Sequence, residues 1–153
     1  MAFEFRLDKV LKYRKRVVEK HTRFVAEANR VVVGINEKMD ALNVDIDQLL
    51  KTNNSEMNIT LNVESLIAQG QWLAHLEDML EALENELAEA DLELSRQRLL
   101  LTSAWRDQEV LERLREKQKA TWQEMQNKVE IKELDEIGQI RSDRRKREKV
   151  SPH

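Results

Sequence analysis

The chain contains two long stretches in which apolar residues recur every three or four positions. In the first stretch, ten of twelve positions spaced alternately by four and three residues are apolar, and Arg14 and His21 are the exceptions. This spacing places the twelve side chains in one stripe along a helix that pairs with another helix by knobs-into-holes packing. We predict a helix over about residues 7–51. Its stripe consists of Leu11, Arg14, Val18, His21, Val25, Ala28, Val32, Ile35, Met39, Leu42, Ile46 and Leu49.

The second stretch follows the same rule with one polar exception, Gln97. The same spacing continues to Val129 with more polar residues among its positions, and an apolar face persists to about Arg141. No proline interrupts residues 70–149, so we predict a helix over about residues 71–147, followed by a short disordered C-terminal tail. Its stripe consists of Leu73, Leu76, Leu80, Leu83, Leu87, Ala90, Leu94, Gln97, Leu101 and Ala104.

A polar connection separates the two predicted helices, at residues 52–70. It is rich in Asn, Ser and Thr, which favour turns and helix caps over helix interiors. Whether its second half, residues 60–70, forms a separate helix is left open. Because the connection is short, the two helices should be antiparallel neighbours. We therefore predict an all-α, single-domain chain over residues 1–153, folded as an antiparallel coiled-coil hairpin with the second helix longer and its end, beyond about Arg115, unpaired.

Composition supports long helices and narrows the function classes. Charged residues form 36% of the chain and aromatic residues 5%, with three glycines and one proline, a balance typical of coiled coils. The hydrophobic fraction of 41% is too large for an intrinsically disordered chain. There is no cysteine, no apolar run of membrane-spanning length and no signal-peptide pattern at the start, so we expect a location in the reducing cytoplasm.

Charge is segregated along the sequence, and the predicted hairpin would bring two basic blocks to the same end. An acidic stretch without any basic residue lies between them, and such an arrangement steers binding toward an oppositely charged surface. The first basic block consists of Arg6, Lys9, Lys12, Arg14, Lys15, Arg16, Lys20 and Arg23. The second consists of Arg141, Arg144, Arg145, Lys146, Arg147 and Lys149. The acidic stretch consists of Glu77, Asp78, Glu81, Glu84, Glu86, Glu89, Asp91 and Glu93.

Several apolar residues fall beside the predicted stripes. A second row on the first helix would either widen the seam or form a partner-binding surface. Trp105 and Trp122 would each serve as a core residue or as an exposed anchor. The second row consists of Val10, Val17, Phe24 and Val31.

Catalytic and nucleic-acid functions find no support in the sequence. His21, His75 and His153 lack the i,i+4 spacing of metal ligands, and carboxylates on exposed helix faces are not shielded as catalytic acids must be. The basic ends carry no Asn or Gln at base-reading positions. We therefore expect a non-enzymatic protein with no cofactor, no small-molecule substrate and no nucleic-acid partner.

Four segments, in this order and spacing, resemble the flagellar export protein FliJ family and its type III secretion stalk relatives. The resemblance covers nearly all 153 residues. The first two segments are Phe5-x-Leu7-x-x-Val10-Leu11-x-x-Arg14 and Trp72-Leu-x-x-Leu76-Glu77. The others are Ala104-Trp105-Arg106 followed by Leu111-x-x-Leu114, and Glu130-x-Lys132-x-Leu134-Asp135-Glu136 leading to Arg141.

The resemblance implies a stalk that looks like the gamma subunit of rotary ATPases. Its partners would be the export ATPase hexamer, the cytoplasmic domain of the membrane export gate and export chaperones, at the inner membrane of the flagellar base. Asp45 and Leu49 stand where the family carries tyrosines on the gate-facing side. The implied ATPase-binding residues are Leu7, Leu11, Arg14, Lys132, Leu134, Asp135, Glu136 and Arg141. The implied gate-binding residues are Leu42, Leu49, Trp72, Leu76, Met79 and Leu83.

The alternative is a generic coiled-coil scaffold, or the stalk subunit of another secretion or rotary ATPase. The sequence does not distinguish a flagellar protein from an injectisome relative. A stable homodimer with parallel helices would favour the scaffold, whereas a monomer would favour the stalk.

Overall fold

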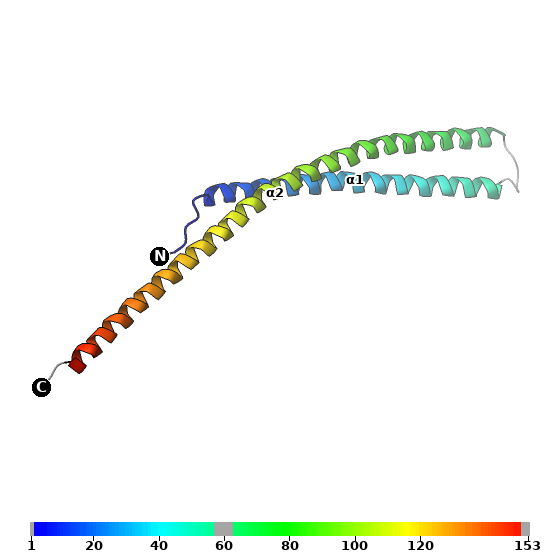
Figure 1. Cartoon of the computed structure of the whole chain (residues 1–153). Coiled ribbons are helices and arrows are strands. Elements are labelled where there is room, and N and C mark those ends of the chain that lie inside the picture. The colour runs from blue at the N-terminus through cyan, green and yellow to red at the C-terminus, as the bar shows by residue number, and fades with distance from the viewer. Residues whose placement is uncertain (1, 57–62, 151–153) are drawn as a thin grey trace. The chain divides into compact units, whose positions relative to one another are not determined.

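The computed structural model describes residues 2–56 and 63–150, which form two helices (Figure 1). Helix α1 spans Asp8–Glu56 and has 49 residues, and helix α2 spans Val63–Val150 and has 88. The described residues contain no strand. The predicted all-α fold with a longer second helix is therefore confirmed. Among these residues, neither helix has a stretch apolar enough to cross a bilayer.

The helices are longer than the sequence predicts. Helix α1 runs beyond Lys51 to Glu56, and α2 begins at Val63 rather than near residue 71, so that residues 63–70 belong to α2. Beyond the predicted end, the Thr52 hydroxyl donates a 2.9 Å hydrogen bond to the carbonyl oxygen of Gln48, so this polar group has a partner in the helical conformation. Polar residues such as Asn and Thr destabilise a helix by only a few tenths of a kcal/mol each. One added backbone hydrogen bond, worth about 1 kcal/mol, offsets such a cost.

The C-terminal boundary also differs. Helix α2 continues to Val150, three residues beyond the predicted end at residue 147. The centre of the predicted turn, residues 57–62, and the last three residues of the predicted tail lie outside the described residues.

The helical chain divides into two compact units. Unit 1 combines Met1–Lys15 with Arg106–His153, and unit 2 is Arg16–Trp105. In a helix pair each residue contacts only residues near its own position along the helix axis. The pair therefore has no single core shared along its whole length, as a globular domain has.

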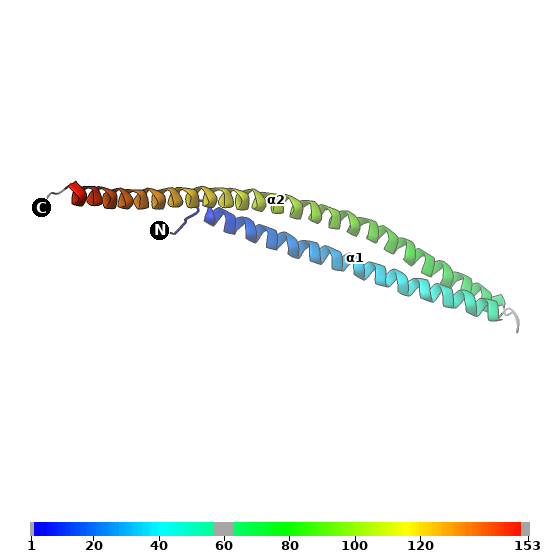
Figure 2. The same ribbon diagram turned by 60° about the horizontal axis from the view of Figure 1, so that its bottom comes forward.

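Unit 2 is an antiparallel helix pair. Its segments of α1 and α2 run side by side in opposite directions (Figures 1 and 2). Leu42 and Leu83 line one groove between the helices, and Ala28 and Gln97 line another. Moving from the first groove to the second takes 14 residues back along α1 and 14 residues forward along α2, which is the register of an antiparallel pair.

The apolar stripes form the contact between the helices. All twelve predicted stripe positions of α1 are buried or half-buried, as are all ten of α2 from Leu73 to Ala104. The acidic side chains between Glu77 and Glu93 are all exposed. The stripe residues of unit 2 that are buried rather than half-buried are Ile35, Leu42, Leu76, Leu94 and Ala104.

Unit 1 begins as a helix pair and ends as a single helix. Gln108 and Leu111 of α2 continue the stripe and are half-buried, but the next two stripe positions, Arg115 and Gln118, are exposed. From Asn127 to Val150 every residue is exposed. Figure 2 shows this end of α2, in orange and red, with no other helix beside it. We call residues 127–150 the free helix.

Candidate functional site

The N-terminal segment before α1 is anchored to α2 by aromatic side chains. Phe5 is buried, and the rings of Phe3 and Trp122 lie 6.0 Å apart between centroids, tilted by 52°. This separation and tilt fall within the range that aromatic pairs prefer. The carbonyl oxygen of Phe5 accepts a 3.1 Å hydrogen bond from the backbone N–H of Asp8, which turns the segment into the first residue of α1. Trp122 is thus partly covered by the chain's own N-terminus.

An ion pair joins the start of α1 to α2. A guanidinium nitrogen of Arg14 lies 3.4 Å from a carboxylate oxygen of Asp107. Both side chains are about half exposed, so water weakens the attraction. Leu11, one turn earlier on α1, is 4% exposed and supplies the apolar contact at this level.

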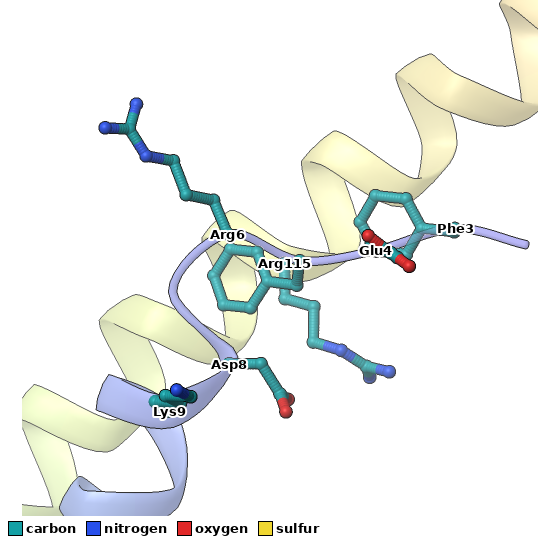
Figure 3. Close-up of a pocket in the computed structure, with 7 residues that line it drawn as sticks. Phe3, Glu4, Arg6, Asp8, Lys9 and Arg115 are labelled. Carbon is teal, nitrogen blue, oxygen red and sulfur yellow. The ribbon is translucent and has the colours of Figure 1, made fainter.

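A groove of about 630 Å³ lies where Arg115 of α2 meets the N-terminal segment. In Figure 3 the Arg115 side chain passes the segment on the same side as the Asp8 carboxylate, and Arg6 points the other way. Charges of both signs surround the groove, which suits a polar protein surface better than a small apolar ligand. Its lining consists of Phe3, Glu4, Phe5, Arg6, Asp8, Lys9 and Arg115.

The eight predicted ATPase-binding residues fall in two separate places of unit 1. Leu7 and Arg14 are half-buried and Leu11 is buried, all against the paired part of α2. The other five, Lys132, Leu134, Asp135, Glu136 and Arg141, are exposed on the free helix. Lys132 lies 17 residues beyond Arg115, the first exposed stripe position of α2, which is roughly 25 Å along the helix. The structure therefore does not gather the eight residues into one patch.

A similar separation along α2 divides the second basic block from the residues of the first block that lie in unit 1, which are Arg6, Lys9, Lys12, Arg14 and Lys15. The predicted hairpin would bring them together, but Arg141 lies 26 residues beyond Arg115, roughly 39 Å along the helix axis. The reason is that α1 is too short to reach that level of α2. The second basic block therefore stands alone at the end of the free helix.

The predicted gate-binding residues of unit 2 include both seam and surface positions. Leu42 and Leu76 are buried, whereas Leu49 and Leu83 are half-buried. Met79 and Trp72 are exposed, and the Trp72 ring lies 5.4 Å from that of His75. Only the exposed and half-buried members are accessible to a partner.

A second groove, in unit 2, brings three of these residues together. It has a volume of about 410 Å³, and its floor is apolar while Lys38, Asp45 and Glu86 supply charge. Such a surface, apolar at its centre and polar at its rim, is typical of protein-binding sites. Its apolar lining consists of Ala41, Leu42, Met79, Ala82 and Leu83.

The second apolar row of α1 is largely on the surface. Val10, Phe24 and Val31 are exposed, and Val17 is half-buried, so the row does not simply widen the seam. Phe24 is flanked on α1 by the Lys20 ammonium, 5.7 Å from its ring centre, and by the His21 ring at 6.0 Å. Phe24 and Val31 also line a shallow groove of about 270 Å³ with Glu93 and Gln97.

The role of Phe3 was not predicted from the sequence, and that of Trp122 was left open between a core residue and an exposed anchor. The alternation Phe3-x-Phe5 ahead of the helix start is a signal for an extended segment with one apolar face, and it could have identified Phe3 but not its contact with Trp122. Trp105, by contrast, is exposed. Within residues 2–56 and 63–150 no cluster of side chains could hold a metal ion.

Comparisons with known proteins extend this description. No curated protein matches the chain. A solved structure described as a YscO homologue from Chlamydia trachomatis shares the fold, with a TM-score of 0.58 and 19% sequence identity, over 95% of this chain and 99% of that one. The family model described as flagellar FliJ protein matches residues 3–147. Since the match spans nearly the whole chain, the protein belongs to the flagellar FliJ protein family.

Proposed function

We propose that this chain is a non-enzymatic component of the bacterial flagellar type III protein export apparatus. It acts as a central stalk that binds and stimulates the export ATPase ring and links the ring to the membrane export gate. The observation that carries the proposal is the free helix, residues 127–150, in which every residue is exposed and none packs against another helix of the described chain.

The free helix is well suited to insertion into a protein ring. Its 24 residues extend roughly 36 Å, and an isolated helix of this length gains most of its stability from packing against a partner. It displays apolar side chains at Leu134, Ile137 and Ile140, each about half exposed or more. Its last two turns are strongly basic, which favours a ring surface with acidic loops.

The contact with the export gate is proposed for unit 2. The 410 Å³ groove between α1 and α2 contains Leu42, Met79 and Leu83, and Trp72 lies exposed on the same helix as Met79. An exposed Trp is among the residue types that contribute most to binding energy at interfaces. Asp45, at the groove's rim, would face the gate in place of a tyrosine.

The protein would work in the cytoplasm, peripherally attached to the inner membrane at the flagellar base, in support of motility. It would also escort export chaperones, for which the exposed row of Val10, Phe24 and Val31 offers an apolar surface. No cofactor, nucleic acid or small-molecule substrate takes part.

Removing residues 130–153 tests the ATPase contact. The truncated chain keeps the seam and the contacts of Phe3 and Phe5, so its helix pair should remain folded while stimulation of the purified export ATPase is lost. Undiminished stimulation by the truncated chain would reject the proposal. A finer pair of variants is Leu134→Ala and Leu92→Ala, because both leucines are exposed, 67% and 73%, but only Leu134 lies on the free helix. Stimulation should fall for the first variant and stay unchanged for the second.

The alternative function is a coiled-coil scaffold or the stalk of another secretion ATPase. The fold shared with the YscO homologue favours the second form of this alternative. Assaying stimulation with the flagellar ATPase and with an injectisome ATPase side by side separates the two stalks. A stable dimer paired in parallel along the seam, with no effect on either ATPase, would establish the scaffold.

A further inference from the structure

One face of the free helix carries opposite charges at its two ends and two apolar residues between them. Glu130, Leu134, Ile137 and Arg141 are separated by four, three and four residues. At 3.6 residues per turn this spacing aligns them on one face, with Glu130 and Arg141 three turns apart. Read in either direction, the face presents a charged end, two apolar residues and the opposite charge. All four side chains are exposed, Leu134 by 67% and Ile137 by 48%.

Neither charged end of this face can pair along its own helix. Residues three and four positions away are the only ones within reach of a helical side chain. Around Glu130 these are Gln126, Asn127, Glu133 and Leu134, and none is basic. Around Arg141 they are Ile137, Gly138, Arg144 and Arg145, and none is acidic. In the described part of the chain no ion pair forms at Glu130 or at Arg141.

We propose that this face binds a second copy of the chain, with the two free helices antiparallel about a two-fold axis between residues 135 and 136. In that register Glu130 of each copy faces Arg141 of the other, and Leu134 faces Ile137. A two-fold pair is isologous, so each contact occurs twice. The arrangement covers Leu134 and Ile137 of both copies, and it pairs Glu130 of each copy with Arg141 of the other.

The same sequence disfavours a parallel pair. Parallel helices would place Glu130 against Glu130 and Arg141 against Arg141, which repel. In the antiparallel register, Arg144 and Arg145 of one copy lie opposite the uncharged Asn127 and Gln126 of the other. The face is also turned by about a quarter of the helix circumference from Trp122, eight residues before Glu130, so the contact with Phe3 stays intact.

The pair would have a regulatory consequence, which rests on the proposed function. It covers Leu134 and Arg141, two of the residues proposed to contact the ATPase. A chain paired with a second copy could therefore not bind the ring through the same face, and the dimer would be a storage form. The experiments below contain no ATPase, so their outcome does not depend on the stalk function.

Charge reversal tests the pairing by sedimentation of the full chain over a concentration series. The wild type should rise from the monomer mass of 18.1 kDa toward twice that value. Glu130→Arg and Arg141→Glu should each raise the dissociation constant of the dimer about tenfold, which corresponds to roughly 1.4 kcal/mol of binding free energy. The double variant should restore association. Glu136→Arg, the same change on another face of the free helix, serves as the control. A chain that stays monomeric throughout, or a double variant without recovery, overturns the proposal.

Cysteine cross-linking tests the register independently. The chain has no cysteine of its own, so introduced thiols are unique. Mixing Leu134→Cys with Ile137→Cys chains under mild oxidation should give a disulfide-linked heterodimer more readily than either variant alone. Preferential linkage of Leu134→Cys to itself would indicate a parallel pair and overturn the antiparallel register. Far-UV circular dichroism of each variant confirms that the helices are intact.

Discussion

A guanidinium nitrogen of Arg14 lies 3.4 Å from a carboxylate oxygen of Asp107, although the two residues are 93 positions apart in sequence. The pair joins α1 to α2 within unit 1, next to the buried Leu11. Arg14 belongs to the predicted apolar stripe, where its long stem can cover apolar surface while its charge reaches the edge. The predicted ATPase-binding role of Arg14 therefore competes with a contact inside the chain.

This ion pair should contribute little to stability. Its side chains are 40% and 52% exposed, and exposed pairs are typically worth about 0.2–1 kcal/mol. A double-mutant cycle with Arg14→Ala and Asp107→Ala, followed by urea unfolding, should give a coupling energy in that range that shrinks at high salt. The pair Glu109 and Arg113, which lies within α2, provides a comparison. A coupling energy well above 1 kcal/mol would contradict this assignment.

The seam of unit 2 should dominate its stability. Leu76 is only 3% exposed, and truncating such a leucine removes buried apolar area and leaves a cavity. Leu76→Ala should therefore lower the free energy of unfolding by about 2–3 kcal/mol. Leu92→Ala, on an exposed face of the same helix, should change it by less than about 0.5 kcal/mol. Equal effects in urea unfolding would mean that the stripe is not the packed face.

The contact between Phe3 and Trp122 should be visible in fluorescence. In a background with Trp72→Phe and Trp105→Phe, Trp122 is the sole tryptophan, and its indole is half-buried. Phe3→Ala should move its emission to longer wavelength, because water replaces the covering ring. Ala2→Gly, an adjacent exposed change, serves as the control. Identical emission from the Phe3→Ala variant would show that the N-terminal segment does not cover Trp122.

Replacing Gly138 should stabilise the free helix locally. The glycine lies inside α2, and a Cβ added there meets no atom within 4 Å. Alanine in a helix interior is favoured over glycine by about 0.5–1 kcal/mol. Gly138→Ala should slow amide hydrogen exchange at neighbouring residues by a few-fold and leave unit 2 unchanged. Faster exchange near residue 138 would contradict the open surroundings of this position.

The helix pair itself follows from the sequence. The stripe from Leu11 to Leu49 is buried or half-buried at every predicted position, because burial of a narrow apolar face is the dominant favourable term and the heptad spacing determines that face. The helix ends were less predictable. The Asn-rich stretch after Thr52 opposes a helix only weakly, and helical hydrogen bonds carry α1 to Glu56.

The site was predicted less completely than the fold. Leu11 and Leu42 were assigned both to the seam and to partner-binding sites, and both are buried in the seam. A family motif does not separate the residues that pack from those that bind. Phe3 and Trp122 are far apart in sequence, and nothing in the helical periodicity connects them. Their contact depends on an extended segment, for which local pattern rules offer only the alternation of Phe3 and Phe5.

A spin-label distance in unit 1 tests most directly whether α1 and α2 pair within one molecule. Val10 and Val110 are both exposed and can be replaced by labelled cysteines, with unlabelled chain added in excess to suppress distances between molecules. Helices packed 8–10 Å apart predict one short distance, roughly 20 Å with the label arms included. A continuous helix that does not fold back would separate the labels by roughly 150 Å, and the absence of the short distance would contradict the account.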